Sequence, residues 1–469
     1  MRRLAPAVFL APALSLLAGC GGDPEAPEAQ ATPAEAMPAV VTLADFQGDW
    51  SGTLEVGAQA LPLVLHVEGP GDVTLDSPAQ GAFGLRAEAA VTDGALTATW
   101  PDIGATYTAT LSKARDAVAG DFVQGGQTFR LRLTRSAAPI AVPDRPQAII
   151  GTPPYALVTG SAQSAPGTRL AYTLTLPEGD GPYPGVVLIT GSGAQDRDET
   201  IMGHKPFAVL ADRLTRAGIA VLRFDDRGTA RSTGAFQDAT SRDFATDAAA
   251  MLAELRRVVP TEGGTLSRVG MLGHSEGGLV ALLAAAETDA APDFVVSMAG
   301  PFVPMGDVLI RQTGDALRTR SATSAQVDGA VAAQTRLVTA ATSGDTPEAA
   351  CSAIRDASAG MPLSVQTEAQ AFCAPWFYQL LRIDPAAVFA AADVPTLALF
   401  GALDRQVAAE PNAAAAEAAG AEVRVLSGLN HLFQTAGDGS VAEYARIEET
   451  MNEEAMALVA NWILARDAD

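Results

Sequence analysis

A serine stands at the centre of the pentapeptide Gly273–Gly277, which reads G-H-S-E-G. A short apolar run at 268–272 precedes it, and a strongly helix-forming stretch at 278–286 follows it. The pattern G-x-S-x-G between a strand and a helix is typical of a tight turn that lifts a serine hydroxyl clear of a sheet. The amides at the start of the helix also favour negative charge at that point. We therefore predict that Ser275 is a nucleophile.

A serine nucleophile needs a general base, and the chain contains 4 histidines. His431 lies in a loop that follows the last predicted strand, 422–426, which is where a base that comes after the nucleophile is expected. His66 is far upstream, in what reads as a strand of another domain. His204 precedes a predicted helix and could line the site, whereas His274, inside the turn, is expected to point away from the serine. We predict His431 as the base.

The third member of such a group is a carboxylate that orients the histidine and stabilises its cation. Residues 395–401 form a near-continuous apolar run, which is typical of a buried parallel strand, and Asp404 follows its end. An aspartate just past such a strand faces the ligand crevice of an open α/β sheet. We predict Asp404 as the acid and keep Asp307 as the reserve candidate. The chain order Ser275, Asp404, His431 is the order of α/β-hydrolases.

Backbone amides must hold the negative charge that develops on the substrate oxygen. One is expected from Glu276, directly after the serine. The other should come from the loop after an earlier apolar strand, 184–190, where two glycines in G-S-G let the backbone approach a substrate closely. We predict the amide of Ser192, with that of Gly193 as the second choice, and a plain tight turn is the alternative. A phosphate-binding loop is disfavoured because no Gly-Lys-Ser/Thr follows.

Residues 191–199 resemble the G-S-G-x-x-D-R-D-E segment of a bacterial esterase branch of the α/β-hydrolase superfamily, close to the prolyl-oligopeptidase and proline-iminopeptidase families. Four further segments are similar to that branch: 203–207, 222–228, 273–278 and 428–433. The resemblance spans roughly residues 150–469 and implies ester hydrolysis by a Ser-His-Asp triad without a metal or organic cofactor. It departs at Thr229, where a second glycine is frequent. Asp226 and Arg227 are expected to be scaffold that braces the serine turn.

The N-terminal segment predicts the cellular location of the protein. Two arginines precede an apolar run at residues 4–16, which is typical of a signal peptide and too short to span a bilayer. The run ends in L-A-G-C, which resembles a bacterial lipobox and implies removal of residues 1–19 and a lipid on Cys20. Ordinary secretion is the alternative. A glycine follows Cys20, which implies the periplasmic face of the outer membrane, and residues 20–42 are predicted to form a disordered tether.

Two further cysteines, Cys351 and Cys373, complete the 3 in the chain. An oxidising periplasm would favour a disulfide between them, and two buried thiols are the alternative. We predict the disulfide.

Size and charge narrow the possible partners. The chain has 469 residues, of which 48% are hydrophobic, and a formal net charge of −23. This length predicts two or three domains. The charge disfavours nucleic acid, whose phosphates would be repelled, and anionic lipid surfaces, so the lipid anchor is expected to hold the protein at the membrane. No protein partner is indicated.

Residues 43–135 contain short alternating segments separated by Gly and Asp turns, which is typical of a small antiparallel sandwich or barrel. No chemical constellation stands out in them. Recognition of an insoluble substrate, shielding of the active site and stabilisation of the fold are all open roles. A linker at 136–150, which contains prolines, leads to the catalytic domain at 151–469.

Residues 301–390 are an insertion between the serine and the acid, with an alanine-rich helical stretch at 325–343. Insertions at this place cap the site in α/β-hydrolases. The aromatic residues Trp376, Phe377 and Tyr378 line the acyl pocket in one reading and pack the cap onto the core in the other.

The sequence therefore predicts an α/β-hydrolase fold, a mostly parallel sheet with helices on both faces and a helical cap, preceded by a small antiparallel β domain. The function it predicts is that of a lipid-anchored serine carboxylesterase that acts on small-molecule esters. A serine peptidase or amidase of the same fold is the second hypothesis, and an inactive binding lipoprotein is the third.

Overall fold

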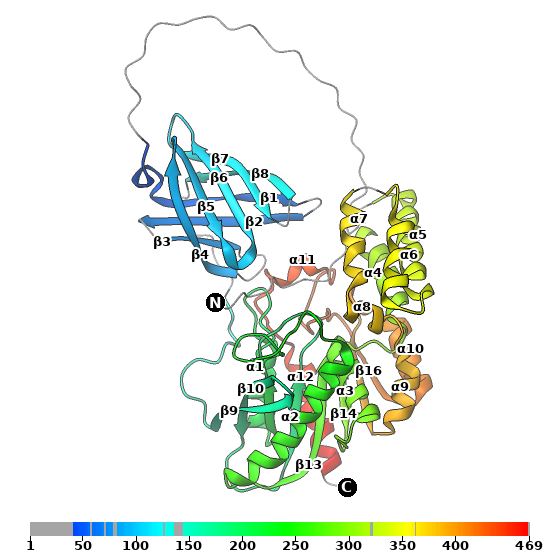
Figure 1. Ribbon diagram of the computed structural model, residues 1–469. Helices are drawn as coiled ribbons and strands as arrows, with labels where there is room; N and C mark the ends of the chain where they lie inside the picture. Colours follow the sequence, from blue (N-terminus) through cyan, green and yellow to red (C-terminus); the bar gives the residue numbers. More distant parts are fainter. Residues whose placement is uncertain are drawn as a thin grey trace, which may run out of the picture. The chain divides into compact units, whose positions relative to one another are not determined.

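The computed structural model (Figure 1) describes residues 41–56, 59–69, 72–77, 82–124, 127–135, 144–318, 322–361 and 363–467. The predicted signal peptide at 1–19, the predicted lipid site Cys20, most of the tether and half of the predicted linker lie outside this part of the chain. The described residues divide into two compact units, one up to Arg135 and the other from Asp144 onward.

The first unit is a closed antiparallel barrel in which each strand pairs with the next along the chain. Its strands are β1 (Gly48–Val56), β2 (Gln59–Gly69), β3 (Asp72–Ser77), β4 (Ala82–Thr92), β5 (Ala95–Trp100), β6 (Ala105–Leu111), β7 (Ala117–Gln124) and β8 (Gln127–Arg135). Alternate side chains, including the fully buried Trp50, Trp100 and Tyr107, fill the interior. The sequence left a sandwich or a barrel open, and the pairing of β8 with β1, with Trp50 opposite Arg135, makes it a barrel.

The second unit is built on an eight-stranded sheet whose order is β16-β15-β14-β13-β11-β12-β10-β9. Its strands are β9 (Ala156–Ala165), β10 (Thr168–Leu176), β11 (Tyr183–Ile189), β12 (Ala220–Phe224), β13 (Leu266–His274), β14 (Val295–Met298), β15 (Thr396–Gly401) and β16 (Glu422–Leu426). Strand β10 runs antiparallel to both of its neighbours, and every other pair is parallel. This is the α/β-hydrolase fold that the sequence predicts.

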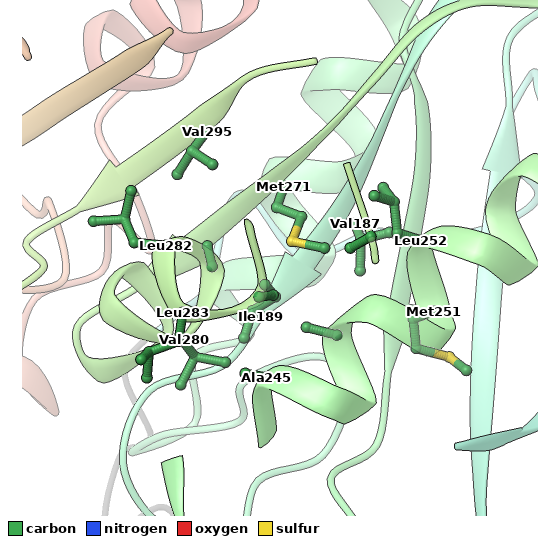
Figure 2. Close-up of a cluster of buried hydrophobic side chains, with 14 of the residues drawn as sticks. Val187, Ile189, Ala245, Met251, Leu252, Met271, Val280, Leu282, Leu283 and Val295 are labelled. Atoms are coloured by element: carbon green, nitrogen blue, oxygen red, sulfur yellow. The ribbon is translucent and has the colours of Figure 1, made fainter. Parts of the chain in front are cut away.

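Helices cover both faces of this sheet. Helices α1 (Pro206–Arg216) and α12 (Glu453–Asp467) pack on one face, and the other face carries α2 (Ser241–Thr261), α3 (Glu276–Glu287), α9 (Pro385–Ala392) and α10 (Ala409–Ala419). Figure 2 shows Met271 of β13 and Val187 of β11 among side chains of α2 and α3, such as Leu252 and Leu283. Because both faces are covered, the central strands β11 and β15 are buried along their whole length and are mostly apolar.

The insertion is a helical cap, drawn mainly in yellow in Figure 1. It consists of α4 (Met305–Arg318), α5 (Ser324–Ser343), α6 (Pro347–Ser358), α7 (Leu363–Ala369), a 3-10 turn η4 (Gln370–Cys373) and α8 (Pro375–Leu380). The cap has its own apolar core around Leu337, Ile354 and Phe372. The predicted disulfide between Cys351 and Cys373 is present and joins α6 to the turn. Among the described helices, none is both long and apolar enough to cross a membrane.

Candidate active site

Ser275 occupies the sharp turn between β13 and α3. Its backbone has φ 54° and ψ −126°, a conformation that is costly for a residue with a side chain. The amide of Ser275 donates a 2.8 Å hydrogen bond to the carbonyl of Met298 at the end of β14, which helps to hold the turn. A Cβ atom on Gly273 would overlap the carbonyl of Gly277, and one on Gly277 would overlap the carbonyl of Ile189. The two glycines of the motif are therefore required by the close packing of the turn.

Asp404 and His431 lie together beyond the ends of β15 and β16. The Nδ1 atom of His431 is 2.7 Å from Oδ2 of Asp404, and their side chains are 5% and 0% exposed. The other carboxylate oxygen of Asp404 accepts the amides of Gln406 at 2.7 Å and Val407 at 2.8 Å. Both oxygens of the aspartate are thus held, and the proton on His431 is directed to Nδ1. Asp307, the reserve candidate, lies exposed on α4, and the carboxylate beside His431 is that of Asp404.

The loop that carries His431 is held by its own side chains. The Oδ1 atom of Asn430 accepts the amides of Leu432 and Gln434, each at 3.0 Å. Phe433 anchors the loop in the core beneath the sheet and is fully buried. Because β13, β15 and β16 are parallel, their carboxyl ends share one edge of the sheet, and this edge brings the serine turn to the histidine loop.

The loop after β11 packs directly against the serine. A Cβ atom on Gly191 would lie 3.1 Å from Cβ of Ser275. Gly193 has a φ of 100°, which glycine adopts without strain. The hydroxyl of Ser192 donates a 2.7 Å hydrogen bond to the carboxylate of Glu276. The loop predicted to supply an oxyanion amide is therefore next to Ser275 and is hydrogen-bonded to the residue that follows it.

The carboxylate of Glu276 has a structural role that sequence reasoning missed, since only its amide was considered. The side chain accepts hydrogen bonds from Ser192 Oγ, from Ser241 Oγ at 2.6 Å and from Trp376 Nε1 at 2.7 Å. Burial raises the pKa of Glu276, and these three hydrogen bonds oppose that rise. Glu276 thereby connects the serine turn to the loop after β11, to the start of α2 and to the cap.

A second buried pair, His274 and Glu199, lies beside His431 and was also missed. Nδ1 of His274 lies 2.9 Å from Oε1 of Glu199, and Nε2 of His274 lies 2.9 Å from the carbonyl oxygen of His431. The rings of His274 and His431 are 4.8 Å apart between centroids. His274 therefore points away from the serine, as expected, but toward the histidine loop. Glu199 and His274 each belong to one of the motif segments of the sequence. A motif does not indicate which residues of another segment it contacts, and these two are 75 positions apart.

The three aromatic residues of α8 point in different directions. Trp376 faces Glu276, Phe377 is buried in the cap core, and the hydroxyl of Tyr378 binds the carbonyl of Asp345 at 2.9 Å. The three residues therefore do not share one role, either in lining a pocket or in packing the cap onto the core. Of the three, Trp376 is the one that hydrogen-bonds to the serine turn.

His204 lies in the scaffold and is fully buried between Thr450 and the carbonyl of Tyr444. Burial lowers its pKa to about 4. Asp226, which is expected to brace the serine turn, holds the loop after β11 that packs against that turn. Its carboxylate binds Thr190 Oγ1 and the amide of Gln195, which shape the loop after β11.

A cavity of about 250 Å³ lies between the start of α4 and the loop that carries Asp404. Its lining includes Val303, Asp307, Arg311, Arg405, Gln406 and Asn412. None of the three aromatic residues of α8 is among the residues that line it. In the described part of the chain, no cluster of three or more His, Cys, Asp or Glu side chains is arranged to hold a metal ion.

Residues 204–435 match the family model described as serine aminopeptidase, S33. Esterase EstD of Thermotoga maritima is 35% identical over 136 residues, which are 29% of this chain and 31% of that protein, so the match spans about a third of the relative. Among solved structures, the Pyrococcus furiosus esterase Pf2001 is similar at 15% identity, covering 70% of this chain and 98% of the other with a TM-score of 0.42. The proline iminopeptidase of Mycobacterium smegmatis is similar at 15% identity, covering 66% and 100% with a TM-score of 0.41.

The order and direction of the strands and the serine turn between β13 and α3 agree with the family match at residues 204–435. The second unit has the α/β-hydrolase fold, and residues 204–435 within it are similar to the serine aminopeptidase family.

Proposed function

We propose that the protein is a serine hydrolase that cleaves carboxylic esters with Ser275, His431 and Asp404. The observation that carries the proposal is the 2.7 Å contact between His431 Nδ1 and Asp404 Oδ2, at the sheet edge that also bears the strained serine. Because Asp404 accepts the Nδ1 proton, the lone pair of the neutral ring is on Nε2. That nitrogen is the one that takes the serine proton.

In the first half of the reaction, Ser275 Oγ attacks the ester carbonyl carbon while its proton passes to His431 Nε2. The negative charge moves to the carbonyl oxygen, where the amide of Glu276 and that of Ser192 or Gly193 stabilise it. The tetrahedral species then collapses, His431 gives its proton to the departing alcohol, and an acyl-serine ester remains. Asp404 stabilises the imidazolium during these steps and stays ionised.

In the second half, water replaces the alcohol. His431 removes a proton from the water as its oxygen attacks the acyl carbon, and the proton then passes to Ser275 Oγ as the acid departs. The same base and the same oxyanion amides act twice, so each of these groups affects both halves.

Two observations bear on whether the scissile bond is an ester or an amide. The similarity to Esterase EstD supports esters, and the family description as a serine aminopeptidase supports removal of an N-terminal residue from a peptide. An aminopeptidase needs a carboxylate to bind the substrate ammonium. Of the two buried glutamates beside the serine turn, Glu276 is occupied by three protein donors and Glu199 is paired with His274. This occupancy favours the ester.

The test is hydrolysis of p-nitrophenyl esters from acetate to octanoate by the protein lacking residues 1–20, beside Ser275→Ala. We expect turnover by the wild type and a loss of at least about a thousandfold in the variant. The dependence on acyl length measures the acyl pocket. Aminoacyl p-nitroanilides, assayed in parallel, identify the peptidase alternative if they are cleaved more efficiently than every ester. A protein that acts on neither class supports the hypothesis of an inactive binding lipoprotein.

We also propose that Cys20 carries a lipid that holds the protein at the periplasmic face of the outer membrane. The support is the L-A-G-C sequence after the apolar run, followed by glycine. Cells that express the full chain and are fed radiolabelled palmitate should yield a labelled protein in the membrane fraction. Cys20→Ala should abolish the label, and a label that survives this substitution would contradict the proposal.

A further inference from the structure

Both ring nitrogens of His274 face hydrogen-bond acceptors. Nδ1 lies 2.9 Å from Oε1 of Glu199, and Nε2 lies 2.9 Å from the main-chain carbonyl oxygen of His431. The side chains of His274 and Glu199 are 7% and 4% exposed, so bulk water does not provide alternative partners. A neutral imidazole has one donor nitrogen and one acceptor nitrogen, so it can satisfy only one of these two contacts.

The location of the protons follows from the partners of Glu199. Its Oε1 atom already accepts the amide of Gly191 at 3.1 Å in addition to His274. Its Oε2 atom is buried and has no hydrogen-bond partner. A proton on Oε2 would be a buried donor without an acceptor, at a cost of about 1–3 kcal/mol. With both ring nitrogens of His274 protonated, Oε1 accepts the Gly191 amide and the Nδ1 proton as a carboxylate oxygen, which is a stronger acceptor than the hydroxyl of a neutral carboxyl group.

The electrostatics agree with this assignment. Burial alone lowers the pKa of His274, but the charge and hydrogen bond of Glu199 outweigh it and raise the pKa above its usual value. His204 shows the opposite case in the same protein. Its Nδ1 faces the hydroxyl of Thr450, its Nε2 faces the carbonyl of Tyr444 and the side-chain amide of Gln434, no carboxylate is among these partners, and burial lowers its pKa. A carboxylate partner thus favours the charged form of His274, whereas the uncharged partners of His204 favour its neutral form.

We propose that Glu199 and His274 are positioning residues. As an ion pair, they fix the relative positions of the loop that carries His431, the turn that carries Ser275 and the loop after β11. His274 is adjacent to Ser275 in the chain, so its backbone is fixed by the turn. Through Nε2 it holds the carbonyl of His431, and through Glu199 it holds the amide of Gly191, which packs against the serine. The inference rests on the proposed function, because these three segments carry the base, the nucleophile and an oxyanion donor.

The consequence is kinetic. An ester can bind in the ground state without the base in line, but proton transfer from the serine requires His431 Nε2 within hydrogen-bond reach. Loss of the pair should therefore lower kcat and leave KM nearly unchanged. A displacement of the base by about 1 Å is enough to reduce the rate by roughly a hundredfold.

The test compares Glu199→Gln with Glu254→Gln in the full protein. The first substitution keeps the side-chain volume and an oxygen for the Gly191 amide but removes the charge that His274 needs. The control removes the charge of another largely buried carboxylate, on α2, which is paired with Arg257 and Tyr172. We expect kcat to fall at least tenfold in Glu199→Gln with KM within threefold of the wild type, and the control to keep both within twofold.

A second readout does not depend on activity. Nitrogen-15 NMR of the histidine rings distinguishes an imidazolium from a neutral ring, and the chain has only 4 histidines, with the signal of His274 assigned from its loss in His274→Asn. At pH 7.5 we expect both ring nitrogens of His274 to be protonated in the wild type and one to be deprotonated in Glu199→Gln.

A neutral His274 in the wild type would overturn the proposal. So would a kcat of Glu199→Gln that stays within twofold, or one that falls only in proportion to the loss of folded protein. These results differ from failure of the proposed function, in which the wild type itself hydrolyses no ester and takes no fluorophosphonate. In that case the proposed function itself is wrong, and the positioning role, which depends on it, is wrong as well.

Discussion

The indole nitrogen of Trp376 donates a 2.7 Å hydrogen bond to the carboxylate of Glu276, the residue that follows Ser275 in the chain. Trp376 belongs to α8 of the cap, and Glu276 begins α3 beneath it. A single contact thus connects the cap to the serine turn. The same carboxylate holds the hydroxyl of Ser192, so the position of the cap is coupled to the loop after β11.

We predict that Trp376→Phe weakens this connection. Phenylalanine keeps most of the ring packing but removes the N–H, which leaves a buried carboxylate with two of its three donors. Removing one partner of a buried polar group should lower the free energy of unfolding by about 1–3 kcal/mol. Urea unfolding of the variant measures the loss, and p-nitrophenyl ester kinetics should show a broader range of accepted acyl lengths.

The matched control is Tyr378→Phe on the same helix, because that hydroxyl binds a main-chain carbonyl at an exposed position. An equal loss of stability in both variants would contradict a special role for Trp376.

Asp404→Asn should inactivate the protein through the tautomer of His431. One oxygen of Asp404 accepts two main-chain amides, so the single oxygen of asparagine must stay there. Its NH₂ group then faces His431 Nδ1, which has to become an acceptor, and the ring proton moves to Nε2. The base no longer has a lone pair toward the serine, and kcat should fall by roughly 10³–10⁴-fold with the fold intact. Steady-state kinetics and circular dichroism check this, and a loss below tenfold would argue against Asp404 as the acid.

Removal of the disulfide should affect the cap. The bridge joins residues 22 positions apart, for which chain-entropy arguments give about 3 kcal/mol of stabilisation. The cap has its own apolar core, so we expect the double variant Cys351→Ser, Cys373→Ser to open the cap locally before the sheet unfolds. Limited proteolysis followed by mass spectrometry should find new cleavage sites within 301–390. Cleavage at an unchanged rate and at unchanged sites would show that the bridge does not stabilise the cap.

Stability should fall in mild acid because of His204. Its pKa is about 4 in the folded protein, below the usual 6.5, so the unfolded chain binds the extra proton first as the pH falls. The contribution is fully present above pH 6.5 and is lost between pH 6.5 and about 4, to a limit of roughly 3 kcal/mol. Urea unfolding at several pH values measures it. In His204→Gln this part of the pH dependence should disappear, and an unchanged slope would show that other groups cause it.

The strands that carry the proposed triad were readable from the sequence because buried parallel strands leave continuous apolar runs. The run predicted at 422–426 is β16 itself, and the run at 395–401 differs from β15 by one residue. The motif around Ser275 was equally readable because it is a short continuous pattern: Gly273 is required by an overlap with the carbonyl of Gly277, and Gly277 by an overlap with the carbonyl of Ile189 at the end of β11. A pattern that is continuous in the chain can be recognised even where one of its contacts is distant.

Contacts between distant segments left no such continuous pattern. Whether the N-terminal strands close into a barrel depends on the pairing of β1 with β8, at opposite ends of that unit. The pair of Glu199 and His274 is invisible for the same reason. The aromatic residues of α8 are a different case. Successive residues of a helix point about 100° apart, so three consecutive side chains cannot all line one pocket. The sequence already contained that constraint.

The most direct test of the central claim is covalent labelling with a fluorophosphonate, followed by peptide mapping of the intact protein. If Ser275 is activated by His431 and Asp404, the wild type should take up one adduct per chain, on the peptide that contains Ser275. Ser275→Ala should take up none. Absence of an adduct on the folded wild type, or an adduct on another residue, would contradict the proposed hydrolase.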